Sequence, residues 1–258
     1  MSHHIVEAQD LHFTYPDGTE VLKGISFRIT HGESVAIVGA NGAGKSTLLL
    51  HLNGYLTSSG GVLRIGDSPL LPENVKQVRR AVGLVFQDPD DQLFMPTVFD
   101  DVAFGPLNMG LPPDEVRARV EKALRTVGAW HLHERPPYRI SGGEKRAVAI
   151  ATVLSMSPDI LVMDEPSSNL DPKSRRLLIE LLKGFTHTKI IATHDLDMVM
   201  DLCRRTLVIR DGRIIADGPT AGIMRDEELL ASCNLEKPLS LRSCPVCGET
   251  ADPGPPGR

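Results

Sequence analysis

One eight-residue loop constrains this chain more than any other feature. It fits the pattern G-x-x-x-x-G-K-[ST], with an apolar strand expected before it at 34–38 and a helix after it at 45–52. The alternative is a glycine-rich turn without a ligand, and a match to the whole pattern with both flanks disfavours it. Glycines let backbone N–H groups converge on phosphate oxygens, and the helix dipole adds positive potential. A nucleotide phosphate site is therefore predicted at Gly39-Ala40-Asn41-Gly42-Ala43-Gly44-Lys45-Ser46.

The composition and charge of the chain disfavour several classes of protein. The 258 residues are 41% apolar and 24% charged, which is enough for a sizeable core without metal or disulfide staples. With 28 Lys and Arg against 33 Asp and Glu, the net charge is −5, so nucleic acid is not an expected partner. No run approaches the roughly 20 apolar residues that span a bilayer, and residues 1–10 do not resemble a signal peptide. We therefore expect a cytosolic chain with reduced cysteines that reaches a membrane only through partner proteins.

Strand and helix patterns alternate along most of the sequence, which predicts a mostly parallel sheet flanked by helices. The expected strands are 5–15, 21–29, 34–38, 62–65, 82–86, 160–163, 189–192, 206–209 and 213–216. The expected helices are 45–52, 114–127, 141–155, 172–183 and 196–203. Helices concentrate between 87 and 155, which indicates a helical subdomain inserted in the α/β core. From Cys233 onward proline and glycine become frequent, so that end is expected to be loosely ordered.

Two further motifs carry charge or hydrogen-bond donors. The apolar strand 160–163 leads into Asp164 and Glu165, and the carboxyl ends of parallel strands are where ligands bind. Asp164 is suited to hold Mg²⁺ and Glu165 to polarise an attacking water. Ser141-Gly142-Gly143-Glu144 opens a helix, where it fits a capping box. The same unpaired N–H groups could instead receive a γ-phosphate, and two adjacent glycines in a helix favour close backbone approach.

Together these motifs resemble those of the ATP-binding cassette (ABC) ATPases, whose signature is a Ser-Gly-Gly-Gln or Ser-Gly-Gly-Glu element. The likeness covers about residues 5–224. It implies a P-loop NTPase (RecA-like) core with an N-terminal antiparallel β subdomain and an inserted helical signature subdomain at about 88–155. It places the ATPase domain at 5–225 and a C-terminal extension at 226–258. By this resemblance Tyr15 stacks on adenine, Gln87 senses Mg²⁺, His194 contacts the γ-phosphate and Asp171 lies in a loop at a dimer interface.

The resemblance also implies a ligand set and an assembly. ATP would be bound by Gly39, Asn41, Gly42, Ala43, Gly44, Lys45, Ser46 and Thr47, with Mg²⁺ at Ser46, Gln87 and Asp164. Lys45, Glu165 and His194 would be the catalytic residues. Because one chain holds one phosphate loop and one signature, two ATP molecules would lie between two chains arranged head to tail. Lys45 of one subunit would then face Ser141, Gly142 and Gly143 of the other, in a homodimer or in a heterodimer with a sister ATPase.

A finer resemblance concerns the segments Asp88–Phe94, Pro96–Val98 and Asp101–Pro106, which are similar to those of energy-coupling-factor importer ATPases. It implies uptake of cobalt, nickel or a vitamin, with integral membrane partners and a peripheral location at the cytoplasmic face of the membrane. The chain departs from the common pattern at Ile140, Glu144 and 167–169, without losing an essential group. The alternative is an ABC ATPase of another importer or of a non-transport process such as repair or translation. However, the 96 positions from Lys45 to Ser141 hold no heptad run.

One feature lies outside these motifs. Cys244-Pro245-Val246-Cys247 is half of a zinc-ribbon pattern, which would need a third thiolate from Cys233 or another pair from a second chain. The other interpretation is a flexible segment with two reduced thiols, which the incomplete ligand set favours.

Overall fold

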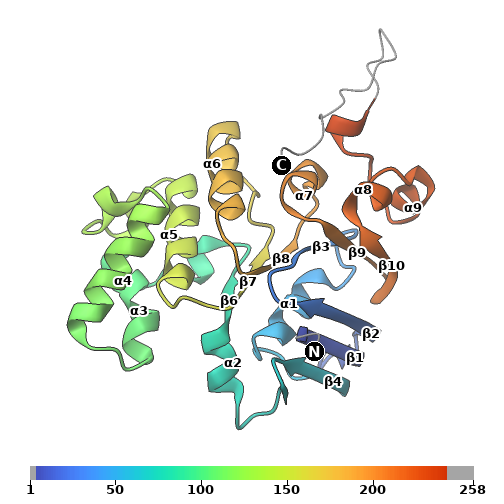
Figure 1. The fold of residues 1–258 in the computed structure, drawn as a ribbon, viewed down its shortest axis with the longest axis horizontal. Helices are drawn as coiled ribbons and strands as arrows, with labels where there is room; N and C mark the ends of the chain where they lie inside the picture. Colours follow the sequence, from blue (N-terminus) through green and yellow to red (C-terminus); the bar gives the residue numbers. More distant parts are fainter. Residues whose placement is uncertain (1–3, 243–258) are drawn as a thin grey trace.

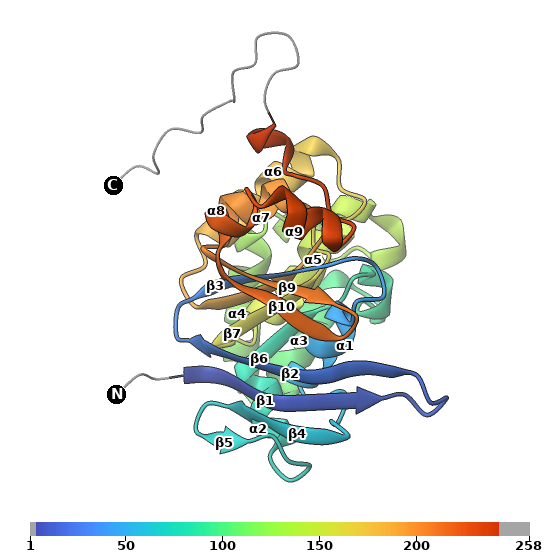
Figure 2. The same cartoon turned by 90° about the vertical axis from the view of Figure 1, so that its right-hand side faces the viewer.

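Two β-sheets and the helices around them form the part of the chain that the computed structural model describes, residues 4–242 (Figure 1). The larger sheet has the order β10-β9-β3-β8-β7-β6, and the smaller has the order β2-β1-β4-β5. Both sheets were expected from the sequence. In Figure 2 the smaller sheet runs below the larger one, and helices α6 to α9 lie on the opposite side.

The larger sheet is parallel except at one edge, where β10 pairs antiparallel with β9. Its core strands are continuous apolar runs because both faces are buried. In β7, for example, Ile160 and Val162 pack on the side of the small sheet, while Leu161 and Met163 pack on the helical side. Its strands are β3 (Ser34–Val38), β6 (Val82–Val85), β7 (Ile160–Asp164), β8 (Thr188–Ala192), β9 (Arg205–Arg210) and β10 (Arg213–Pro219).

The smaller sheet is antiparallel, and its apolar residues share a core with helix α1 (Lys45–Leu52). Leu48, Leu49 and Leu52 of α1 are fully buried in that core. The sheet therefore holds the phosphate-loop helix against the larger sheet. Its strands are β1 (His4–Thr14), β2 (Glu20–Thr30), β4 (Gly60–Ile65) and the two-residue β5 (Ser68–Pro69), followed by helix α2 (Val75–Ala81).

Only helices lie between β6 and β7, and they form the group on the left of Figure 1. They are η1 (Pro89–Asp91), α3 (Val98–Asn108), α4 (Pro113–Thr126), η2 (Trp130–Leu132), η3 (Pro137–Arg139) and α5 (Gly142–Leu154). The sequence predicted α4 and α5 but not α3, which contains Pro106. Pro106 has no N–H to bond the carbonyl of Val102, four residues earlier. The hydroxyl of Ser155 donates to that carbonyl at 2.8 Å instead, so the helix continues past the proline.

The last third of the described chain carries α6 (Pro172–Lys183), α7 (Leu196–Leu202), α8 (Thr220–Ile223), α9 (Glu227–Ser232) and η4 (Leu239–Leu241). The loosely ordered end expected from Cys233 was wrong for residues 233–242. Cys233 and Leu241 are buried in the helical-side core, and Asp197 accepts the N–H groups of Leu239 and Ser240. Pro238 is the N-cap of η4, and it does not prevent Leu241 of that turn from packing in the core. Cys244 and Cys247 lie outside the described residues.

None of the helices between residues 4 and 242 has the length and apolar character needed to cross a bilayer. Within the same range, no three or more His, Cys, Asp or Glu side chains gather in a metal-binding arrangement.

Candidate functional site: a phosphate-binding cleft at the carboxyl edge of the sheet

Four neighbouring strands deliver the predicted functional residues to one edge of the larger sheet. The phosphate loop follows β3, His194 follows β8, Asp164 ends β7 with Glu165 next, and Gln87 follows β6. Because parallel strands end on the same side, these residues converge there. A cleft of about 590 Å³ opens at this edge, and the predicted residues that line it are Tyr15, Asn41, Gly42, Gly44, Lys45, Ser46, Thr47, Gln87, Glu165 and His194.

The phosphate loop owes its shape to close backbone packing. A Cβ at Gly39 would lie 2.2 Å from the carbonyl oxygen of Ile209 on β9, so only glycine fits there. Gly42 and Gly44 have φ of 78° and 103°, and Gly44 is the N-cap of α1. These left-handed glycines turn the chain so that the first N–H groups of α1 face the cleft. The side chain of Ala43 is buried, and the Ala43 carbonyl accepts from Gly212 N at 3.3 Å. These contacts hold the loop against the segment that joins β9 and β10.

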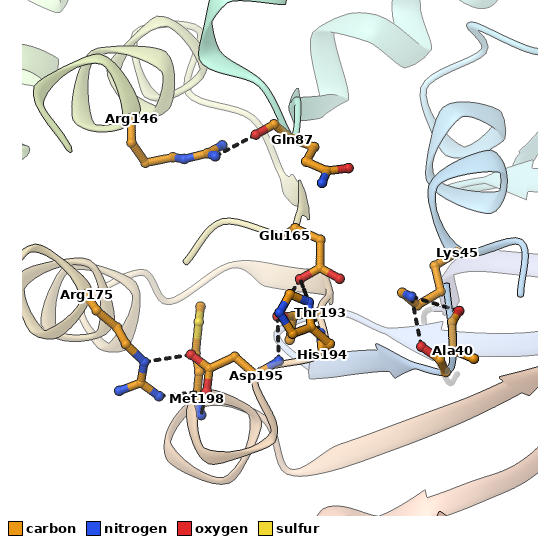
Figure 3. A network of polar contacts seen from close by, with 11 residues as sticks. Ala40, Lys45, Gln87, Arg146, Glu165, Arg175, Thr193, His194, Asp195 and Met198 are labelled. Atoms are coloured by element: carbon orange, nitrogen blue, oxygen red, sulfur yellow. Dashed lines mark hydrogen bonds and ion pairs between the residues drawn. The ribbon is translucent and has the colours of Figure 1, made fainter. Parts of the chain in front are cut away.

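Lys45 is the cation of the loop. Its side chain is buried, and its ammonium group donates to the carbonyl oxygens of Gly39 at 2.8 Å and Ala40 at 3.2 Å (Figure 3). The Lys45 ammonium group is therefore held inside the phosphate loop by the loop's own carbonyls. A phosphate oxygen in the cleft would offer this ammonium a charged acceptor in exchange for a neutral carbonyl, and charge-assisted bonds are the stronger ones.

Tyr15 lies at the open end of the cleft, after β1. Its hydroxyl lies 3.2 Å from the Thr47 hydroxyl, and its ring meets Phe13 edge-on at 4.8 Å. Tyr15 is half-buried and lines the cleft. The location is compatible with adenine stacking, which stays a prediction.

Asp164 has the surroundings of a cation ligand. It is 8% exposed, and its Oδ1 atom is buried with no hydrogen-bond partner. Burial, with the neighbouring charge of Glu165, raises the pKa of Asp164 above its ordinary value against the opposing effect of the Ser46 hydroxyl. Ser46, Gln87 and Asp164 line one further cleft of about 550 Å³. An unpartnered buried carboxylate oxygen beside a hydroxyl and an amide oxygen fits Mg²⁺, which prefers oxygen ligands and few carboxylates.

Glu165 is held in place from three sides. Its backbone has φ of 44°, which an L-residue adopts only at some cost, and its N–H donates to Ala192 O at 2.8 Å. One carboxylate oxygen, Oε2, lies 2.8 Å from His194 Nδ1 and accepts from His194 N at 3.2 Å and Thr193 Oγ1 at 2.9 Å (Figure 3). All three donors reach Oε2, so Oε1 is the oxygen left to accept a hydrogen from water.

The segment that carries Gln87 is clamped to helix α5. Arg146 is 3% exposed and donates to the carbonyls of Phe86 at 2.8 Å and Gln87 at 2.6 Å. Gln92 accepts from Phe86 N and donates to Ala149 O at 2.8 Å, and Lys145 pairs with Asp90 at 2.6 Å. Arg146 and Thr193 were not predicted, since neither stands in a pattern of its own. The only available signal was their position, with Arg146 two residues after Glu144 and Thr193 directly before His194.

The predicted signature residues lie elsewhere in the chain. Ser141, Gly142, Gly143 and Asp171 are not among the residues lining the cleft of Lys45, whereas Gly142 lines a separate cleft of about 500 Å³ with Gln87 and Ser168. Ser141 forms the capping box of α5, accepting from Glu144 N and donating to the Glu144 carboxylate at 2.8 Å. Asp171 caps α6 by accepting from Lys173 N and Ser174 N. One chain therefore brings the phosphate loop, Gln87, Glu165 and His194 together, but not the signature.

A strand–loop–helix phosphate cradle beside a buried Asp-Glu pair, on a mostly parallel sheet, defines a P-loop nucleoside triphosphatase. The more particular family follows from comparison with known proteins. The ABC transporter family model matches residues 22–168, more than half of the chain. The chain belongs to the ABC transporter family, and it is an ABC ATPase, the subunit type that hydrolyses ATP.

Three relatives refine this placement. A protein of Geobacter sulfurreducens that bears the name of an ABC transporter ATP-binding protein is 70% identical over 248 residues, covering 96% of this chain and all of the relative. The energy-coupling factor transporter ATP-binding protein EcfA of Methanocaldococcus jannaschii is 47% identical, with 91% of this chain and 86% of that protein covered. The solved structure of CbiO1 from Clostridium perfringens, described as part of the ABC transporter complex CbiONQ, has a TM-score of 0.78. It is 41% identical, and the match covers 90% of this chain and 95% of that one.

Proposed function

We propose that the chain is the ATP-hydrolysing subunit of an energy-coupling-factor importer. In this role it drives uptake of a transition-metal ion, cobalt or nickel, or of a vitamin, through integral membrane partners. Support comes from the similarity to EcfA and to CbiO1, and from the segments at 88–94, 96–98 and 101–106. The chain would work as a peripheral subunit at the cytoplasmic face of the membrane.

The observation that carries the dimer part of the proposal is the separation of the phosphate loop from the signature segment. Lys45 and the first N–H groups of α1 face one cleft, whereas Ser141 and the start of α5 lie outside it. A second ATPase subunit placed head to tail would bring its Ser141, Gly142 and Gly143 onto the γ-phosphate held by Lys45. Two ATP molecules would then hold the dimer closed, and loss of the γ-phosphate would remove the contact that differs between the closed and open states.

We assign a part in the reaction to each predicted residue of the cleft. Lys45 and His194 would neutralise charge on the γ-phosphate, and Oε1 of Glu165 would orient the attacking water. Ser46, Asp164 and Gln87 would hold Mg²⁺, which supplies charge neutralisation to the phosphates when bound. Asn41 to Gly44 offer backbone N–H groups to phosphate oxygens, and Thr47 lies beside Tyr15 at the adenine end.

The dimer part of the proposal is tested with Glu165→Gln, which should keep ATP while slowing hydrolysis by about 10²-fold or more. With Mg-ATP this variant should run as a dimer holding two ATP molecules, measured by light scattering and nucleotide extraction. Adding Ser141→Arg should leave ATP bound to monomers, because the phosphate loop is intact and the partner's contact is lost. Glu180→Gln on the exposed side of α6 is the matched control. A dimer that survives Ser141→Arg, or wild-type turnover by Glu165→Gln, would contradict the assignment.

The importer part is tested by purification of the tagged chain from native membranes. The expected companions are integral membrane proteins, one of which binds the transported substrate. Recovery with a repair or ribosomal complex instead would reject it.

A further inference from the structure

Thr193 is a buried polar residue in contact with Glu165 of the cleft, and the proposed mechanism does not use it. It follows β8 directly, it is 0% exposed, and its hydroxyl has two partners (Figure 3). The Oγ1 atom donates to Glu165 Oε2 at 2.9 Å and accepts from Asp195 N at 3.0 Å. A hydroxyl has one hydrogen to donate, so the Asp195 contact fixes the direction in which that hydrogen points.

Glu165 needs such support. Its left-handed backbone is a conformation that surrounding structure must maintain. The N–H bond to Ala192 O fixes the main chain, and the hydrogen bonds to Oε2 fix the carboxylate. Of the donors to Oε2, His194 is 65% exposed at its side chain, whereas Thr193 is fully buried. The Thr193 hydroxyl is therefore the side-chain donor least free to move away.

An ion pair between Asp195 and Arg175 joins the segment that carries Thr193 to helix α6. Arg175 donates to both oxygens of Asp195, at 2.6 Å from Nε and 2.8 Å from Nη2. Asp195 also caps α7 by accepting from Met198 N at 2.9 Å. Burial opposes the ionisation of Asp195, but the Arg175 guanidinium and the Met198 N–H outweigh it, so the pKa of Asp195 lies below its ordinary value. Helix α6 begins at Pro172, directly after Asp171, which is expected at the interface with a second subunit.

We propose that Thr193 is a positioning residue for Glu165, and that the Asp195–Arg175 pair ties this support to α6. The inference rests on the proposed function, in which Glu165 orients the attacking water. The Thr193 hydroxyl holds Oε2 so that Oε1 faces the γ-phosphate side of the cleft. The contacts from Arg175 to Asp195, from Asp195 N to Thr193 and from Thr193 to Glu165 form one connected path between α6 and the carboxylate.

Thr193→Val tests the first part, because valine keeps the β-branched shape and removes only the hydroxyl. We expect kcat for ATP hydrolysis to fall about tenfold or more, from loss of a hydrogen bond to a charged group that orients the water. The KM for ATP should stay within about twofold, since no contact with nucleotide is lost. Thr193→Ser, which restores the hydroxyl, should recover most of kcat.

A matched control separates positioning from general destabilisation. Thr206 on β9 is likewise 0% exposed and hydrogen-bonded, to Thr220 at 2.9 Å, and it lies outside the cleft. Thr206→Val should lower the unfolding temperature about as much as Thr193→Val while leaving kcat unchanged. Equal kcat losses in both variants, or no rescue by serine, would overturn the inference.

The second part is tested on α6. Arg175→Met should lower kcat, whereas Arg176→Met, at the neighbouring exposed position, should not. If Glu165→Gln is inactive but Thr193→Val and Arg175→Met turn over normally, the inference fails and the proposed function stands. If Glu165→Gln itself turns over normally, the proposed role of Glu165 fails first.

Discussion

Replacement of Arg146 by methionine isolates the clamp between α5 and the Gln87 segment. The guanidinium makes two bonds to main-chain carbonyls, at 2.8 and 2.6 Å, and the side chain is 3% exposed. Hydrogen bonds to charged groups are worth about 1.5–3 kcal/mol each, so about 3–6 kcal/mol of favourable interaction is lost. Burial lowers the pKa of Arg146, which indicates that its charge is costly to bury. Methionine removes that cost, so we expect a net loss of about 2–4 kcal/mol.

Calorimetry and denaturant unfolding measure this loss directly. At about 2–4 °C per kcal/mol for a protein of this size, the unfolding temperature should fall by roughly 5–15 °C. The Mg²⁺ concentration for half-maximal ATPase activity should rise, because Gln87 loses the contact that fixes its main chain. Arg119→Met is the control, since Arg119 forms only a surface i,i+4 pair with Glu115 worth at most about 0.5 kcal/mol. An Arg146 variant as stable as the Arg119 control, with unchanged Mg²⁺ dependence, would refute the clamp.

Three further substitutions each test one local feature of the structure. Lys45→Ala should abolish ATP binding or hydrolysis in equilibrium binding and turnover assays, and normal kinetics would count against the phosphate loop. Gly39→Ala should cost more than about 3 kcal/mol, because its Cβ would meet a backbone carbonyl at 2.2 Å, whereas Gly222→Ala, with open space around it, should be nearly neutral in urea unfolding. Burial raises the pKa of Asp101, so the stability due to its protonated form is present below the unfolded pKa and is lost as pH rises toward the folded pKa. Asp101→Asn should therefore gain stability relative to wild type as pH rises above about 4, the ordinary aspartate pKa, and a difference that stays constant with pH would contradict this.

The sequence was sufficient for the central elements because their signals are local. Strand β3 and helices α1 and α6 have the predicted boundaries. Strand β3 is a short apolar run, α1 follows directly on the phosphate-loop glycine Gly44, and α6 has its own cap and first-turn proline. The same holds for residues that end sheet strands, such as Asp164. Their position at the carboxyl edge follows from the parallel topology alone.

The misses depend on partners that are distant in sequence. Helix α3 continues past Pro106 because the Ser155 hydroxyl bonds the free carbonyl, and no pattern in residues 98–108 predicts that donor. Arg146 bonds carbonyls about sixty positions earlier, and Thr193 meets a carboxylate 28 positions away. The order of residues 233–242 was also not predicted, for a similar reason. Proline content is a property of the local sequence, whereas Cys233 and Leu241 are held by a core whose other residues are distant in the sequence.

The hydroxyl and N–H groups that form the capping box of α5 at Ser141 are the same groups that would bind a γ-phosphate. The capping box commits its hydroxyl hydrogen to Glu144, and the backbone N–H groups of Ser141 and Glu144 are also paired within it. A γ-phosphate presented by a second subunit would therefore have to displace the Glu144 carboxylate, a negative charge held at the same helix end. The Ser141 N–H and hydroxyl hold the pKa of Glu144 below its ordinary value, so that charge is present at neutral pH. Glutamine at this position would cap the helix without the repulsion, so in the proposed dimer Glu144→Gln is expected to favour the ATP-bound closed state.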